Sequence, residues 1–182
     1  MAGKTNAGGC PKKTDMDKEL QKAASYGLGG REREKAVDAF RARMEEWGCA
    51  LPDTEILVSD FCLGRFPEIG LMEAWIANEQ EGGYCGKYLF VLDGQRCPNH
   101  KHLTKQETFF VVKGTVEMTY GGRTWTMKPG DVLTITPGGF HTFVGKGPAL
   151  LLEISMPCVV DDNFFENTSI PYGLNYKGGE KC

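Results

Sequence analysis

The sequence predicts a mainly β protein, folded as a sandwich or barrel and preceded by a helical extension. After Pro52, apolar and polar residues alternate with period two in a series of short segments, as they do in half-buried strands. Turn residues separate these segments. Glycine supplies 24 of the 182 residues, well above the ~7 % of an average protein, and this excess is typical of turn-rich β folds.

Two helices are expected before the strands. The first is a short helix over residues 15–26, which the glycine-rich segment 27–30 ends. The second covers residues 31–48, because apolar side chains recur at successive helical turns and Gly48 stands at the end. The residues of this apolar stripe are Ala36, Phe40, Met44 and Trp47. The stripe must pack on this chain's own barrel or on that of a partner.

The strands are expected at close spacing along the rest of the chain. Gly121 and Gly122 separate two of them and indicate a two-residue hairpin turn. The expected strands are 55–59, 71–78, 87–92, 107–112, 114–120, 123–127, 132–136, 140–144 and 149–155.

The chain divides into three expected regions. Residues 1–50 form the helical extension, and residues 1–14 within it show no periodicity and are expected to be disordered or to lie over another surface. Residues 51–160 form the barrel. Residues 161–182 form an irregular tail rich in Asn, Gly and Pro.

Composition excludes several classes of protein. The net charge of −3 leaves no basic excess for a nucleic acid, and no apolar run is long enough to span a membrane. Residues 1–15 lack the apolar region of a secretory signal, so we expect a cytoplasmic protein. The seven cysteines form no C-x-x-C pair and are expected to be reduced, mostly structural thiols.

The three histidines of the chain fall in two short segments. In a strand, His100 and His102 point to the same face, and Glu107 can return to that face from the next strand. His141 begins a later strand, and closure of the sheet would bring it opposite the others. Three imidazoles and one carboxylate suit a divalent Fe, Mn, Co, Ni or Zn ion and leave open positions on it.

These segments resemble the two motifs of the cupin family. Residues 94–114 have the spacing of the first motif, Gly-x5-His-x-His-x4-Glu-x6-Gly. Residues 130–145 resemble the second motif, although Thr136 and Gly145 stand where Pro and Asn are usual. Neither departure touches a candidate ligand. The resemblance implies a cupin double-stranded β-helix, a jelly-roll barrel, with one metal ion.

Residues 55–166 resemble more specifically the D-lyxose isomerase group of cupin sugar isomerases. The shared traits are His-x-His at 100–102, Lys-x-Glu-Thr-Phe at 105–109 and Glu-x-Ser at 153–155. Cupin modules of sialic-acid-type sugar synthases share them too. The resemblance implies a homodimeric isomerase of D-lyxose and D-xylulose. Because the sugar presents hard oxygens, Mn²⁺ is the first candidate metal, with Co²⁺, Ni²⁺, Fe²⁺ and Zn²⁺ as alternatives. A cupin dioxygenase and a non-catalytic sugar-binding module are the competing functions.

Aldose–ketose isomerisation also needs a group that moves a proton between two carbons. Lys105 shares a face with Glu107, so it either stabilises a developing enediolate or donates a proton, unless it is a solvated loop lysine. Glu153 lies in an apolar run, where burial would raise its pKa and suit it to proton transfer. Its alternative role is a salt bridge with a residue such as Lys87.

Three further residues are candidates for binding the sugar. Lys87 contacts a hydroxyl or serves as the counter-charge of Glu153. Phe143, two residues beyond His141 on the same face, contacts the sugar in the pocket. Asp161 follows the last expected strand and either binds a hydroxyl at the barrel mouth or forms an ordinary turn.

Overall fold

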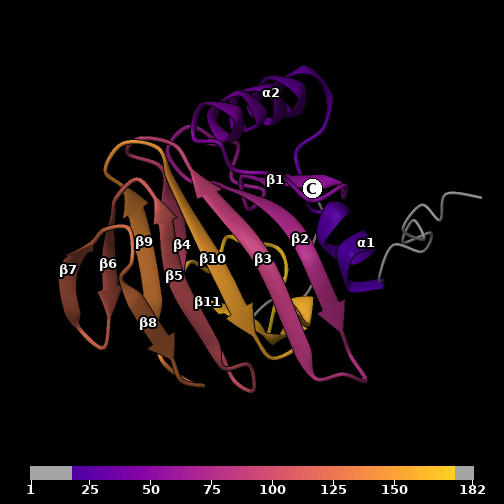
Figure 1. Ribbon diagram of the computed structural model, residues 1–182. Coiled ribbons are helices and arrows are strands. Elements are labelled where there is room, and N and C mark those ends of the chain that lie inside the picture. Colours follow the sequence, from indigo (N-terminus) through magenta and orange to yellow (C-terminus); the bar gives the residue numbers. More distant parts are fainter. Residues whose placement is uncertain (1–17, 175–182) are drawn as a thin grey trace, which may run out of the picture.

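The computed structural model describes residues 18–174, and it consists of two antiparallel sheets that face each other, with two helices at one side (Figure 1). This confirms the predicted mainly β fold. The expectations for residues 1–14 and for the end of the tail lie outside the described residues. The elements are α1 (Lys18–Ala24), α2 (Gly30–Glu46), β1 (Ile56–Ser59), β2 (Leu71–Glu79), β3 (Tyr84–Val91), β4 (Arg96–His102), β5 (Glu107–Lys113), β6 (Val116–Tyr120), β7 (Arg123–Met127), β8 (Val132–Ile135), β9 (His141–Gly145), β10 (Ala149–Ser155), a 3₁₀ turn η1 (Val160–Asp162) and β11 (Asn163–Phe165).

Strands that are distant in sequence are neighbours in both sheets. The six-stranded sheet has the order β1-β2-β3-β10-β5-β8, and the five-stranded sheet has the order β11-β4-β9-β6-β7. Inward-facing side chains of the two sheets form the core, among them Phe109 and Leu151 from the first and Met118 and Phe143 from the second. Alternation along each strand therefore places one set of residues between the sheets.

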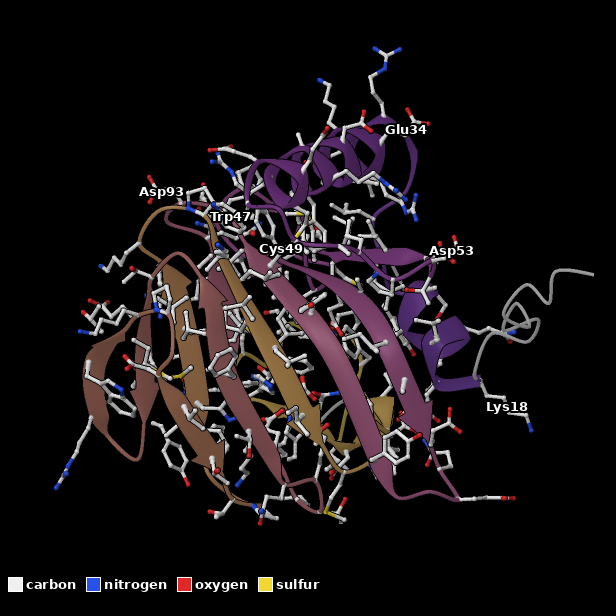
Figure 2. All side chains as sticks on the ribbon, in the orientation of Figure 1. Lys18, Glu34, Trp47, Cys49, Asp53 and Asp93 are labelled. Carbon is white, nitrogen blue, oxygen red and sulfur yellow. The ribbon has the colours of Figure 1, made fainter. Side chains whose placement is uncertain are left out.

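Helix α2 covers one end of the outer face of the six-stranded sheet. The predicted stripe is the buried face of the helix, and the ring of Phe40 stacks on Phe90 of β3 with centroids 4.6 Å apart. Trp47 lies between the end of α2 and the sheet, whereas Glu34 points away from it (Figure 2). The stripe thus packs on its own barrel.

Several details differ from the sequence-based expectations. The strand β4 was absent from the expected strands, because its polar side chains and a proline hide the period of two. Residues 163–165 form β11 and pair with β4, although they lie in the region expected to be irregular. Cys62 is disulfide-bonded, so the expectation of reduced thiols is wrong there. Among residues 18–174, the free cysteines are Cys49, Cys85, Cys97 and Cys158.

The glycine hairpin is confirmed. Gly121 and Gly122 both have positive φ, of 59° and 75°, and they join β6 to β7. This is the conformation that a two-residue turn of matching twist requires. Among the described helices, none is long and apolar enough to cross a membrane.

Candidate metal centre

The two sheets bring four candidate ligands together between them. His100 and His102 come from β4 and His141 from β9 of one sheet, and Glu107 comes from β5 of the other. The strand register places His100 directly opposite His141. One ligand atom from each of the four residues lies within 4.8 Å of all the others, and all four residues are buried. The four side chains meet as expected, but the expected arrangement is wrong: Glu107 faces the histidines from the opposite sheet, and His141 lies beside His100 in the same sheet.

Backbone carbonyls determine which nitrogen of each imidazole faces the centre. Every histidine has its Nδ1 within hydrogen-bond distance of a carbonyl oxygen, so Nδ1 carries the proton and donates it. The Nε2 atom then presents a lone pair to the centre, which is the tautomer of a metal ligand. The three contacts are His100 Nδ1 to Pro98 O at 2.9 Å, His102 Nδ1 to Asp162 O at 3.2 Å and His141 Nδ1 to Gly139 O at 3.1 Å.

The atoms that face the centre lack partners of their own. Glu107 Oε1 lies 2.9 Å from His141 Nε2 and 3.3 Å from His102 Nε2. Despite these short distances, none of the three buried atoms makes a hydrogen bond to any residue between 18 and 174. With the protons on Nδ1, all three are acceptors that repel one another. A divalent cation bound by them removes this repulsion, so the donor set fits a metal ion.

Burial and neighbouring charges favour the protonation states that metal binding needs. Burial lowers the pKa of His100 well below its usual value, and the other two imidazoles lower it further. The pKa of His102 is lowered by burial and by the charge of Lys105. Burial acts to raise the pKa of Glu107, but the ammonium group of Lys105 opposes burial, and that pKa lies well below its usual range. The cluster is therefore neutral imidazole and carboxylate.

A chain of buried charges continues from this cluster across the six-stranded sheet. Lys105 Nζ lies 2.8 Å from Glu107 Oε2 and 3.0 Å from Glu153 Oε1. Lys87 Nζ lies 3.4 Å from Glu153 Oε2 and 3.2 Å from Glu73 Oε2. Lys105 is buried, so it is not a solvated loop lysine.

The expected rise in the pKa of Glu153 is wrong. Burial acts to raise this pKa, but the ammonium groups of Lys105 and Lys87 outweigh burial and lower it. The alternative of a salt bridge with Lys87 is confirmed, and it coexists with the contact to Lys105. Sequence alone did not indicate that two lysines would share this carboxylate.

The charged groups and part of the metal cluster line one cavity between the sheets. Lys87 and Phe143 line it as well, and Phe143 packs edge-on against Phe109 with ring centroids 5.8 Å apart. Asp161 is not among the lining residues, because its exposed side chain pairs with Lys22 of α1. We therefore do not retain Asp161 as a sugar-binding residue.

Sequence reasoning missed the role of the adjacent Asp162. Its carboxylate accepts hydrogen bonds from the backbone N–H groups of Leu103, Thr104 and Lys105, with the shortest at 2.9 Å, and from the Thr104 hydroxyl at 2.7 Å. Its own carbonyl accepts the proton of His102 Nδ1. Asp162 thus holds both His102 and the loop that carries Lys105. The only signal in the sequence is the pair of carboxylates after the last long strand.

The departures from the cupin motif have local explanations. A Cβ atom on Gly145 would lie 2.2 Å from the carbonyl oxygen of Leu92, so no side chain fits at this position. The Thr136 hydroxyl lies 3.1 Å from the hydroxyl of Tyr120 on β6. Neither residue changes the ligand cluster.

Known proteins share both the sequence and the architecture. Residues 88–155 match the cupin domain family. The D-lyxose ketol-isomerase of Thermofilum sp. (strain ex4484_79) is 30% identical to this chain, over 85% of this chain and 96% of the relative. The chain belongs to the D-lyxose isomerase family of cupins. The D-lyxose/D-mannose isomerase of Thermosediminibacter oceani is 29% identical to this chain, over 63% of this chain and 78% of the relative.

Solved structures of other proteins share the fold of this chain. The L-ribose isomerase of Cellulomonas parahominis superposes with a TM-score of 0.62 at 15% identity, over 84% of this chain and 98% of that one. The L-ribose isomerase of Acinetobacter sp. DL28 gives 0.57 at 16% identity, over 74% and 83%. The predicted cupin fold and the predicted class of enzyme, a sugar isomerase, are both confirmed.

Proposed function

We propose that the protein is a metal-dependent isomerase that interconverts free D-lyxose and D-xylulose through a cis-enediol. The observation that carries this proposal is one buried cavity that holds both kinds of group the reaction needs. Unpartnered ligand atoms of His102, Glu107 and His141 lie beside the ionised pair of Glu153 and Lys105. The name and identity of the Thermofilum relative support D-lyxose as the first substrate to test.

His100, His102, Glu107 and His141 would hold the metal, with Mn²⁺ the first candidate and Co²⁺, Ni²⁺, Fe²⁺ or Zn²⁺ as alternatives. A bound divalent ion supplies a Lewis acid that acidifies the C–H next to a carbonyl and stabilises negative charge on sugar oxygens. This contribution matters because Glu153, with its lowered pKa, is a weaker base than an unpaired buried carboxylate.

Glu153 is the proposed proton shuttle. Its Oε1 accepts hydrogen bonds from Lys105 at 3.0 Å and from the Ser155 hydroxyl at 2.9 Å. Within the described part of the chain, its Oε2 has only the longer ion pair with Lys87 at 3.4 Å. Oε2 therefore has a lone pair open to the substrate, and it takes the proton from C2 of the aldose and returns it to C1, while the hydroxyl proton passes from O2 to O1.

Lys105 stabilises charge instead of moving the proton. Burial acts to lower the pKa of Lys105, but the carboxylates of Glu107 and Glu153 outweigh burial and raise it. The group therefore stays an ammonium near neutral pH. Two of its N–H groups are directed to these carboxylates, and the third can donate to the oxygen that becomes negative in the enediolate.

The competing functions are less well supported. A dioxygenase would want a pocket without a base, whereas Glu153 and Lys105 both face the cavity. A sugar-binding module without turnover has no need of two buried lysines and the buried carboxylate of Glu153 beside the ligand cluster, since buried charges are costly.

We also propose a homodimer. The half of the six-stranded sheet that α2 leaves uncovered exposes apolar side chains from four strands. Exposed apolar side chains gathered on one face of a sheet are typical of an interface, and the same face of a second copy would cover them. The exposed apolar residues are Ile76 at 44%, Phe110 at 36%, Val132 at 62% and Ile154 at 57%.

A sugar panel in D₂O tests the reaction and its route together. Chelator-treated protein is supplied with Mn²⁺, Co²⁺, Ni²⁺, Fe²⁺ or Zn²⁺ and with D-lyxose or other common aldoses. We expect D-xylulose from D-lyxose, with deuterium at C1, because the Glu153 proton exchanges with solvent between steps. Ketose free of deuterium even under slow turnover would contradict the enediol route. No conversion with any metal would contradict the proposed reaction.

A further inference from the structure

The cavity contains a carboxylate to which the mechanism assigns no role. The buried charges alternate in sign from the metal cluster outward, and the chain of contacts ends at Glu73 on β2. Strand β2 is three positions from β5 in the sheet order, so Glu73 lies toward the other side of the cavity from Glu107.

Glu73 uses only one of its two oxygens. Its Oε2 accepts hydrogen bonds from the indole Nε1 of Trp75 at 3.0 Å and from Lys87 Nζ at 3.2 Å. Its Oε1 has no partner among residues 18–174. The side chain is 18% exposed and lines the cavity. These two contacts hold the carboxylate and leave Oε1 as an anionic acceptor.

We propose that Glu73 Oε1 accepts a hydrogen bond from the sugar's O4 or O5 hydroxyl and makes Glu73 a specificity-determining residue. This proposal rests on the proposed function. A sugar held with O1 and O2 at the metal cluster extends its remaining hydroxyls away from that cluster. Around Glu73 the lining includes the apolar side chains Leu57, Leu71 and Trp75, where a hydroxyl without a partner is costly.

The same charges select an unphosphorylated sugar. The lysines that line the cavity are Lys87 and Lys105, and each contacts two carboxylates. Neither is left as a free cation for a phosphate, and a phosphate on O5 would meet the Glu73 carboxylate. The substrate class is therefore a free sugar with a hydroxyl at its far end.

A specificity cycle tests the role of Glu73. Wild-type protein and Glu73→Gln are assayed with Mn²⁺ on D-lyxose, 4-deoxy-D-lyxose and 5-deoxy-D-lyxose. In the wild type, kcat/KM should fall at least about tenfold for one of the deoxy sugars, the scale of one hydrogen bond to a charged group. In Glu73→Gln the ratio of kcat/KM for D-lyxose to kcat/KM for that deoxy sugar should shrink toward one, because the anionic acceptor is gone. Glu117→Gln, on the surface, is the matched control and should keep the wild-type ratio.

A purely structural role for Glu73 would lower turnover of all three sugars equally and leave the ratios unchanged, and that result would overturn the proposal. Calorimetry with the three alditols obtained by reducing D-lyxose, 5-deoxy-D-lyxose and 4-deoxy-D-lyxose repeats the cycle without turnover. Calorimetry therefore tests the proposal even if Glu73→Gln is inactive. If Glu73→Gln does not fold, Glu73→Asp replaces it. This variant keeps the charge but withdraws the oxygen, and it should lose discrimination between the sugars in the same way. A wild type that binds and discriminates the alditols but converts no aldose would contradict the proposed function alone.

Discussion

The two sheets supply the cavity with groups that are held in opposite ways. The histidines come from the five-stranded sheet, they are neutral, and backbone carbonyls fix each one separately. The carboxylates Glu73, Glu107 and Glu153 come from the six-stranded sheet, they are charged, and lysine side chains connect them. One sheet therefore offers independent ligands, and the other offers a coupled set of charges.

This difference determines how each side should respond to substitution. Loss of one imidazole removes one ligand and leaves the carbonyl contacts of the other imidazoles in place. Loss of one charge in the coupled set leaves a buried partner with an incomplete environment, which costs more than the missing contact itself. Substitutions of the histidines should therefore change only the substituted ligand, whereas the stability costs of substitutions among the linked carboxylates and lysines should be non-additive.

The largest effect is expected on metal affinity, from substitution of the histidines of the five-stranded sheet. His100→Ala, His102→Ala and His141→Ala should each lower metal affinity more than about 100-fold, beyond the loss seen for residues that only orient a ligand. The metal content after dialysis, measured by elemental analysis, checks this, with Lys146→Met on the surface as a control that keeps its metal. Full occupancy in any two of the three histidine variants would place the ion elsewhere.

On the coupled side, Glu153→Gln should separate binding from chemistry. We expect metal and sugar binding to persist while kcat falls about 10²–10⁴-fold, the usual contribution of a general base. Ser155→Ala removes only a donor to Glu153 Oε1 and should lower kcat much less. Steady-state kinetics with D-lyxose would show it, and near-wild-type turnover of Glu153→Gln would reassign the proton transfer.

A matched pair of lysines tests the coupling through stability. Lys87 and Lys146 each lie 3.2 Å from a glutamate, but Lys87 is buried and Lys146 is exposed. Lys87→Met should cost about 3–5 kcal/mol of unfolding free energy, because the buried carboxylate of Glu153 and the partly buried carboxylate of Glu73 lose a shared cation. Lys146→Met should cost less than about 1 kcal/mol.

Addition of Glu73→Gln to Lys87→Met should restore part of the stability, since it removes the carboxylate left without a cation. Urea unfolding of the metal-free proteins measures all of these values. Strict additivity of Lys87→Met and Glu73→Gln would contradict the coupled description.

The smallest effect is expected at Asp162, which connects the two sides. Asp162→Asn weakens the hydrogen bonds that hold the loop of Lys105 and should cost about 1–3 kcal/mol of stability. The exposed neighbour gives a direct control, since Asp161→Asn should cost less than about 0.5 kcal/mol. Equal costs for the two variants in urea unfolding would mean that the carboxylate of Asp162 does not hold the loop.

The sequence predicted the metal ligands better than the contacts among the linked carboxylates and lysines, for a physical reason. Period two places His100 and His102 on one face of their strand, and the motif spacing marks Glu107 as the fourth ligand; both depend only on local sequence. The contacts of Glu73 and Glu153 depend on which strands are neighbours, and β10 lies between β3 and β5, far from them in sequence. No local pattern contains that order, so the lowered pKa of Glu153 was not predictable.

Within the fold, too, the elements that local sequence determines were predicted, and those that depend on distant strand pairing were not. The α2 stripe and the glycine hairpin follow from local rules and are confirmed. The strand β4 carries two histidines and a proline in seven residues, and only its pairing with β9 and β11 makes it extended. The position of Asp162 likewise depends on β11 returning to β4 after the long strands end.

The central claim is that one divalent ion at the histidine and glutamate cluster is required for sugar isomerisation, and a metal titration tests it directly. Chelator-treated protein is mixed with increasing equivalents of Mn²⁺, and conversion of D-lyxose to D-xylulose is followed. We expect no conversion without metal and a rise that reaches its plateau at about one equivalent per subunit, with little recovery in His141→Ala. Full conversion by metal-free protein, or an unchanged titration in His141→Ala, would contradict the claim.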